Sequence, residues 1–294
     1  MGVRVNMDLW LVTLLNALVW GLLWALLALG LSVIYGTLRA LNLAHGAFYM
    51  LGALLSWALT PTLSFWGAAL VAPAIVGLVG VGLAWLLWGK REYDPLTALL
   101  LTFGIMLILQ QLAVIFLQTT TGSLRHSVMS PLRWPIPVGD RFYEGYRLVV
   151  AAIAGVVLAG FWGIWSRTRW GCALRAVRDN RELAHVVGVP VLWAQAGAFG
   201  VGAALAALAG ALVGPITREV SPTMGVEVVL VSVLLAVAGG LGSLGGALAV
   251  AFLYSFAENL LTALADPMLA RAGALLLIGL ILLVRPQGLG GEDR

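Results

Sequence analysis

The chain contains a succession of apolar runs, each about as long as a bilayer is thick. A membrane-spanning helix needs about 20 mostly apolar residues, and this length limits what the runs can form. They predict spanning helices at 9–35, 40–60, 65–88, 96–118, 148–165, 194–215, 227–241, 246–265 and 271–285. The seventh run is short and ends in glycine, which suggests a partial or broken span. The count of transmembrane helices is therefore eight or nine.

The composition agrees with a membrane protein. Of the 294 residues, 61% are hydrophobic and 10% are charged, whereas a soluble domain has about 25% charged residues. We expect an all-α, polytopic integral membrane protein with a single transmembrane domain over 1–294. The first run is longer than the core of a signal peptide, so we interpret it as a retained span. The net charge of +4 does not indicate nucleic acid, because the arginines lie in loops between apolar runs.

Several features exclude common binding sites. A single cysteine, Cys172, rules out an intramolecular disulfide framework. Three scattered histidines predict no metal-ligand cluster. The run 239–246 contains G-x-G-x-x-G, but apolar membrane segments flank it, and a dinucleotide site needs a strand before the motif and a helix after it. These glycines instead predict a tight turn at the cytoplasmic face, and the chain has no P-loop of its own for ATP.

The basic residues predict an orientation, because cytoplasmic loops are enriched in Lys and Arg. The segment 166–193 contains five arginines and should be cytoplasmic. With nine spans, Lys90, Arg91 and the C-terminal tail also fall inside, and the N-terminus falls outside. The loop 119–147 then lies outside although it contains four arginines, which conflicts with the rule. Its three prolines suggest a rigid external loop.

Polar side chains form stripes within three of the predicted spans. Asn42, His45, Tyr49, Gly52 and Ser56 share one helix face, Thr97, Gly104, Gln111 and Gln118 recur every seven residues, and Ser255, Glu258, Asn259 and Thr262 lie within two turns. Polar groups inside a membrane usually face protein or water. They could line a path for a polar solute or join helices by hydrogen bonds. The path candidates are Asn42, His45, Tyr49, Gln111 and Glu258, and His45 could instead fix its span to a neighbour.

Small residues in the sixth span predict close helix packing. Ala206, Gly210 and Gly214 are spaced by four, a pattern that lets helix backbones approach one another. No internal repeat is visible in the sequence.

The segment 171–189 is amphipathic, and an Asp or Asn near 179–180 could begin a second short helix. A helix lying on the membrane surface is one interpretation. However, Glu182-x-Ala184-x-x-x-Gly188 resembles the loop by which ABC importer permeases dock onto their ATPase subunits. Together with Arg175-Ala-Val-Arg178-Asp-Asn, it resembles that loop in permeases of branched-chain amino acid uptake systems.

Three other stretches resemble the same family and occur in the same order over nearly the whole chain. They are Gly36 with Asn42-Leu-Ala-His-Gly46, Ser221-Pro-Thr-Met-Gly225 leading to the glycine run 239–246, and Leu283-Val-Arg-Pro-Gln-Gly-Leu289. The chain is more similar to the shorter of the family's two permease types.

The resemblance implies a permease subunit of an ATP-driven importer in the inner (plasma) membrane, with no catalytic residues and no cofactor of its own. It implies a second related permease, two cytoplasmic ATPases that bind ATP and Mg, and an external solute-binding protein. The residues that would couple to the ATPases are Arg175, Arg178, Glu182, Ala184 and Gly188. The residues of the structural turn are Pro222, Gly225, Gly239, Gly240 and Gly242.

Other functions stay open at this point. Ala47 stands where many members have an acidic residue, and related permeases carry urea or short amides, so these are alternative solutes. A self-contained ion-coupled secondary transporter and a non-transporting scaffold are further alternatives. The sequence argues against the secondary transporter, because few ionisable residues lie inside the spans and no inverted repeat or paired broken helices can be seen.

Overall fold

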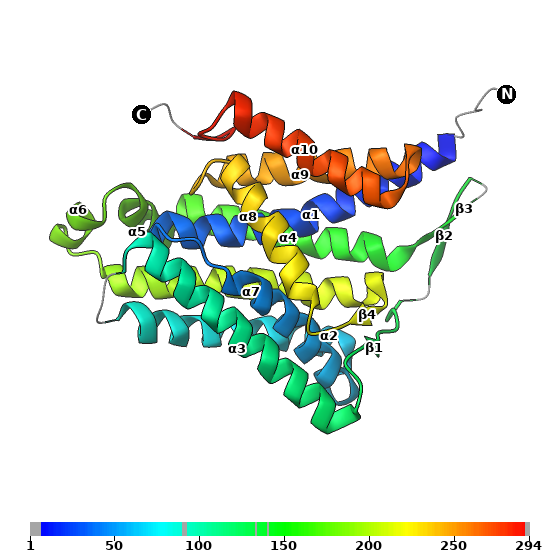
Figure 1. Cartoon of the computed structure of the whole chain (residues 1–294), viewed down its shortest axis with the longest axis horizontal. Coiled ribbons are helices and arrows are strands. Elements are labelled where there is room, and N and C mark those ends of the chain that lie inside the picture. Colours follow the sequence, from blue (N-terminus) through cyan, green and yellow to red (C-terminus); the bar gives the residue numbers. More distant parts are fainter. Residues whose placement is uncertain (1–6, 90–92, 133, 140, 292–294) are drawn as a thin grey trace.

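The computed structural model describes residues 7–89, 93–132, 134–139 and 141–291, which form ten helices and four short strands (Figure 1). In chain order these are α1 (Met7–Leu38), α2 (Ala44–Trp88), α3 (Pro95–Thr121), β1 (His126–Ser127), β2 (Pro135–Val138), β3 (Arg141–Glu144), α4 (Gly145–Arg167), α5 (Arg169–Asp179), α6 (Arg181–Val186), α7 (Val191–Thr217), β4 (Glu219–Val220), α8 (Met224–Ala238), α9 (Leu244–Leu264) and α10 (Pro267–Val284). Within this part, seven helices are long and apolar enough to span a membrane. The all-α, polytopic prediction is confirmed.

The helix α2 contains two of the predicted spans. Its helical geometry is interrupted at Ser64, which has φ 59° and ψ 165°. The first half advances along α7, from Phe48 beside Phe199 to Ala53 beside Gly210. The second half returns along the same helix, from Gly77 beside Ala204 to Trp85 beside Trp193. The chain therefore reverses at Ser64, as the separate predictions 40–60 and 65–88 require.

The seventh predicted span is the short helix α8. Its 15 residues extend about 22 Å at 1.5 Å per residue, which is less than the roughly 30 Å hydrocarbon thickness of a bilayer. The prediction of a partial span is confirmed.

The bundle has two distinct ends (Figure 1). The four strands lie at one end, here called the strand end, and α5 and α6 lie at the other, here called the helical end. The structure thus places the loop 119–147 opposite the segment 166–193. Lys90 and Arg91, expected on the same side as that segment, lie outside the described residues.

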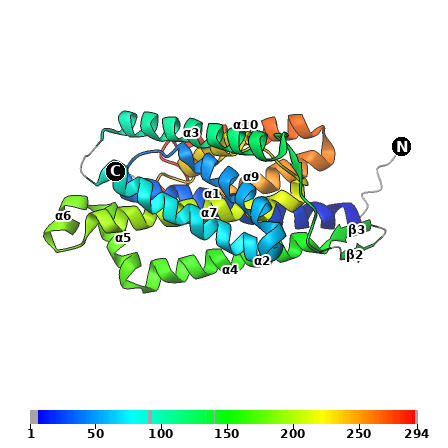
Figure 2. The same cartoon turned by 90° about the horizontal axis from the view of Figure 1, so that it is seen from below.

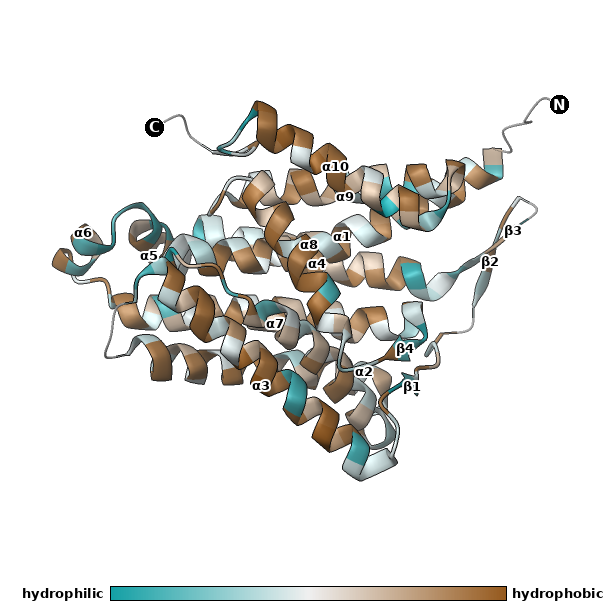
Figure 3. Cartoon of the chain, viewed as in Figure 1, coloured by the Kyte–Doolittle hydropathy of each residue, from teal (hydrophilic) through white to brown (hydrophobic). Residues whose placement is uncertain are grey.

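The helices α1 and α7 form the centre of the bundle and cross where small residues meet. A Cβ added to Gly30 would lie 2.9 Å from the carbonyl oxygen of Gly202. Gly210 packs against the backbone of Tyr49, which confirms the packing role predicted for the sixth span. The helices α3, α4 and α10 lie outside this centre (Figure 2) and consist mainly of hydrophobic residues (Figure 3). Many large apolar side chains on these helices are exposed, as lipid contact requires.

The link between α1 and α2 turns back into the bundle. Arg39 ends α1 in a left-handed conformation with φ 52°. His45, at the start of α2, makes a hydrogen bond of 3.0 Å to the carbonyl oxygen of Leu27, which lies about 16 Å below the end of α1 at 1.5 Å per residue. The helix α2 therefore begins near the middle of the bundle rather than at the helical end.

Irregular backbone at this depth needs hydrogen-bond partners, because lipid supplies none. The hydroxyl of Thr102 on α3 accepts a hydrogen bond from the Leu43 N–H at 3.2 Å, and the same oxygen lies 3.4 Å from the Leu41 carbonyl. The Asn42 side chain accepts one from the Ala44 N–H at 3.0 Å. The Thr102 and Asn42 side chains thus accept hydrogen bonds from the backbone N–H groups at the start of α2.

We expect Thr102→Val to destabilise the protein by about 1–3 kcal/mol, because the substitution leaves the half-buried Leu43 N–H without its partner. Thermal unfolding of the purified protein in detergent measures the loss. Thr119→Val is the matched control, since that exposed hydroxyl bonds only to carbonyls of its own helix. Equal melting temperatures for the two variants would contradict this account of the link.

The link from α7 to α8 resembles the link from α1 to α2, which the sequence did not reveal. Arg218 ends α7 with φ 60°, as Arg39 ends α1, and a short link then leads to α8. Gly225 in the first turn of α8 packs against Gly46 in the first turn of α2. The helices α2 and α8 therefore both begin inside the bundle, which the sequence does not show. In sequence the two links share only an arginine followed seven positions later by a glycine. A hydropathy pattern does not detect such a pair.

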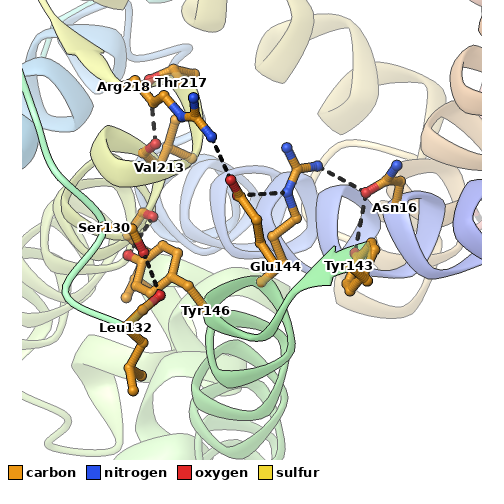
Figure 4. Close-up of polar contacts among 11 residues, drawn as sticks. Asn16, Ser130, Leu132, Tyr143, Glu144, Tyr146, Val213, Thr217 and Arg218 are labelled. Carbon is orange, nitrogen blue, oxygen red and sulfur yellow. Dashed lines mark hydrogen bonds and ion pairs between the residues drawn. The ribbon is translucent and has the colours of Figure 1, made fainter. Parts of the chain in front are cut away.

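Polar contacts fasten the loop 119–147 to the strand end (Figure 4). Arg147 and Tyr143 both donate to the side-chain oxygen of Asn16 on α1, at 2.8 Å and 3.1 Å. Arg218 donates to Glu144 at 2.6 Å, which connects the end of α7 to the start of α4. Burial raises the pKa of Tyr143 to about 12, so its hydroxyl keeps its proton and remains a donor at neutral pH. The loop is thus held at three points.

Candidate functional site

A cavity of about 630 Å³ opens at the strand end of the bundle. We call it the outer cavity. Near its mouth Arg125 forms an ion pair of 3.4 Å with Glu219. Deeper in the bundle, Trp24 of α1 and Tyr49 of α2 line its wall. Trp24 lies near the middle of α1, so the cavity reaches about halfway through the protein.

Charged residues from three helices face this cavity. Glu227 in the first turn of α8 pairs with Arg271 of α10 at 3.3 Å. Glu258 comes from α9, about 9 Å from the strand end of that helix at 1.5 Å per residue. Because α8 begins inside the bundle, its first turn carries Glu227 to the cavity wall. Two carboxylates and one guanidinium therefore lie together in a site that an aromatic wall partly shields.

The predicted path residues divide into two groups. Tyr49 and Glu258 line the outer cavity together. Asn42 and His45 are buried outside it, where Asn42 bonds the backbone at the start of α2 and His45 joins α2 to α1. Gln111 is exposed on the surface of α3. The contact of His45 corresponds to the helix-fixing alternative rather than to path lining.

Some residues of the two other polar stripes join helices, and others line the outer cavity. Ser255 donates to the Ala17 carbonyl on α1 at 2.8 Å, so it joins two helices. Asn259, one turn further, lines the outer cavity beside Glu258. In the fourth span, Thr97 bonds the Asp94 side chain that caps α3, and this bond lowers the pKa of that carboxyl. No residue of this stripe lines the outer cavity.

Sequence reasoning missed Glu227 and Arg271. Each is the first residue of a predicted span, 227–241 and 271–285. The sequence did contain a signal, because these two residues have opposite charges and each borders an apolar run. Only the fold shows that α8 begins inside the bundle and that the two side chains meet.

A second polar region lies at the helical end. Thr168 caps α5 by accepting from the Gly171 N–H at 3.1 Å, and Asn180 caps α6 by accepting from the Leu183 N–H at 3.0 Å. The prediction of a second short helix near 179–180 is confirmed. Gly188 follows α6 with φ 84°.

The residues predicted to couple to a partner differ in exposure. Ala184 is buried on the inner face of α6, whereas Glu182 is exposed. Arg175 donates to the Trp165 carbonyl. The guanidinium of Arg178 lies 5.9 Å from the centre of the Trp165 ring, and its side chain pairs with Asp179 at 3.0 Å.

The glycine run forms the expected turn between α8 and α9. Gly240 and Gly242 have φ values of 89° and 84°, which favour glycine. Gly239 ends α8, and the tail covers this end, because the Gly290 N–H donates to the Gly239 carbonyl at 3.0 Å. Pro222 lies in the link before α8. Gly225, predicted as part of the turn, instead lies inside α8, where it allows the close approach of Gly46.

Comparison with known proteins identifies the family. Residues 13–285 match the model of a family described as the permease component of branched-chain amino acid transport systems. The chain belongs to this permease family. Members of the family are transport subunits of the membrane, so the multi-pass location in the inner membrane follows from the family and from the apolar helices together.

Several curated members of this permease family are similar over nearly their whole length. The high-affinity branched-chain amino acid transport system permease protein LivH of Escherichia coli K12 is 29% identical, with 94% of each chain covered. LivH of Salmonella typhimurium is 28% identical with the same coverage. BraD of Pseudomonas aeruginosa is 27% identical, with 95% of each chain covered. No solved structure matches the chain.

Proposed function

We propose that the chain is the translocation subunit of an ATP-driven importer for branched-chain amino acids. The family match over 13–285 carries this proposal, and the segment that projects at the helical end supports it. Separate ATPases bind ATP and Mg on the cytoplasmic side, which is the helical end. An external binding protein delivers the solute to the outer cavity, and a second related permease completes the membrane part.

The helix α6 offers a surface for an ATPase. It projects beyond the other helices (Figure 2) and exposes Leu183, Val186 and Val187 by 62%, 82% and 75%. Contiguous apolar side chains on a surface that faces water typically mark a contact with another protein. Glu182 beside them adds a charge that can select the partner.

A route of direct contacts leads from this surface to the outer cavity. The Arg178 side chain of α5 would lie 3.4 Å from a Cβ added at Gly36 near the end of α1, and Gly36 in turn packs against Gly242 before α9. The helices α1 and α9 carry Trp24 and Glu258 to the cavity wall. A rigid shift of α5 would thus move two cavity helices, which is the two-state coupling that alternating access needs.

The docking claim is tested with the double variant Leu183→Asp and Val187→Asp. We expect about a tenfold or greater loss of ATPase retained on the purified permease, equivalent to about 1.4 kcal/mol or more of binding, because two charges enter an apolar contact. Co-purification in mild detergent and ATP-dependent leucine uptake in vesicles measure it.

Phe142→Asp is the matched control, because Phe142 is an exposed apolar residue at the strand end. It should retain the ATPases. Normal retention and uptake by the double variant would refute docking through α6.

One observation favours the ion-coupled secondary transporter as an alternative. The helices α2 and α8 both begin inside the bundle, and interrupted helices form the substrate sites of secondary transporters. The purified chain alone is reconstituted into vesicles with a proton or sodium gradient and no ATP. We expect no leucine uptake. Uptake under these conditions would replace the importer proposal with the secondary transporter.

A further inference from the structure

We propose that the outer cavity binds an α-amino acid as a zwitterion, with the carboxylate on Arg271 and the ammonium on Glu258. The inference rests on the proposed function for the class of solute, and it adds the residues that recognise the charged head group. Nothing in the family match assigns these residues a role.

The balance of charges in the cavity favours an ammonium group. Glu227 and Arg271 form an ion pair that joins α8 to α10. Arg271 is close enough to interact electrostatically with Glu258 as well, but among the described residues Glu258 has no ion pair of its own. Ionised groups within a membrane are costly and usually acquire a partner. A ligand ammonium would supply the missing positive charge.

The same cavity offers hydrogen-bond donors for a carboxylate. Arg271 presents a planar guanidinium that matches a carboxylate in geometry. The indole N–H of Trp24 has no hydrogen-bond partner among the described residues, although Trp24 is only 7% exposed and lines the cavity. Thr223 and Met224 place the start of α8 at the cavity wall, where the positive end of the helix dipole favours a negative charge.

The remaining wall suits an apolar side chain. Trp20, Trp24 and Val228 line it, and the volume of about 630 Å³ falls within the range of small-molecule sites. A neutral amide or urea would leave Glu258 without a charged partner and would offer no carboxylate to Arg271. The site should therefore prefer a zwitterion with an aliphatic side chain to the uncharged solutes.

The test uses a cysteine reporter in the cavity wall of the full-length chain. Thr223→Cys is introduced together with Cys172→Ser, since Cys172 is the single native cysteine and is exposed. A membrane-impermeant thiol reagent then labels the reporter in vesicles that display the strand end. We expect millimolar L-leucine to slow labelling, by about tenfold when its concentration is about ten times Kd. Ser221→Cys provides a second reporter on the same wall.

Variants and analogues identify the charged contacts. Glu258→Gln and Arg271→Gln should each abolish protection by leucine, whereas Glu144→Gln, which removes a carboxylate at the same end but outside the cavity, should preserve it. Isopentylamine lacks the carboxylate, 4-methylpentanoate lacks the ammonium, and urea lacks both. None of the three should protect the reporter.

The outcomes separate this inference from the proposed function. Full protection in the Glu258→Gln variant, equal protection by either analogue, or protection by urea alone would overturn the zwitterion site. Protection of both reporters by leucine, lost in both cavity variants, would support it even if no ATP-dependent uptake occurred, and that absence would count against the importer. Uptake without protection of either reporter would leave the importer and refute the site.

Discussion

Replacing Gly52 by valine is expected to remove nearly all folded protein from the membrane. A Cβ at this position would lie 2.0 Å from the carbonyl oxygen of Ala207 and 2.4 Å from its Cα, so the new side chain would meet backbone on α7. A rigid backbone cannot move aside as a flexible side chain can. Overpacking typically costs about 1–3 kcal/mol and more where nothing yields, and here it separates α2 from the central helix.

Gly104→Val controls for the substitution itself. Gly104 lies within α3 and also belongs to a predicted polar stripe, but its Cβ would meet nothing within 4 Å. Both variants place the same β-branched residue inside a membrane helix. Size-exclusion chromatography of detergent extracts measures the monodisperse fraction, which should be close to wild type for Gly104→Val. A normal elution profile for Gly52→Val would show that α2 and α7 do not pack as described.

Hydropathy alone predicted where the helices lie. Each of the nine predicted spans corresponds to one helix or to one half of α2, because a helix in lipid must satisfy its own backbone and so follows the apolar run closely. The glycine turn and the cap of α6 were also foreseen from residue types. These features depend on neighbours in sequence, which a single chain displays directly.

The interior of the site could not be predicted in the same way. The role of Thr102 depends on a backbone segment 59 positions earlier in the chain, and the pairing of Glu227 with Arg271 depends on where α8 begins. His45 and Tyr49 lie within α2 as their spacing predicted, but Asn42 lies in the link before that helix. The same spacing fits a solute path and a helix contact equally well. Only the depth at which α2 begins distinguishes the two.

Ending the chain after Pro286 is expected to lower uptake strongly while the protein still reaches the membrane. The tail holds the end of α8, because the Leu289 N–H donates to the Ala238 carbonyl at 2.9 Å and the Gly290 N–H donates to the Gly239 carbonyl at 3.0 Å. Both carbonyl-bearing residues are buried. Each orphaned buried acceptor costs about 1–3 kcal/mol, so the turn before α9 loses its support.

The functional loss follows from the position of that turn. Gly242 packs against Gly36, and Arg178 of the docking segment packs against Gly36 as well, so a loose turn would absorb the shift of α5 before it reaches α1 and α9. ATP hydrolysis by the assembled complex should therefore continue while leucine uptake falls by about tenfold or more, a loss of coupling of about 1.4 kcal/mol. Ending the chain after Gly291 retains both tail hydrogen bonds and should leave uptake unchanged. If both truncated chains transported equally well, motion of the docking segment would have to reach the cavity by contacts that do not involve the tail.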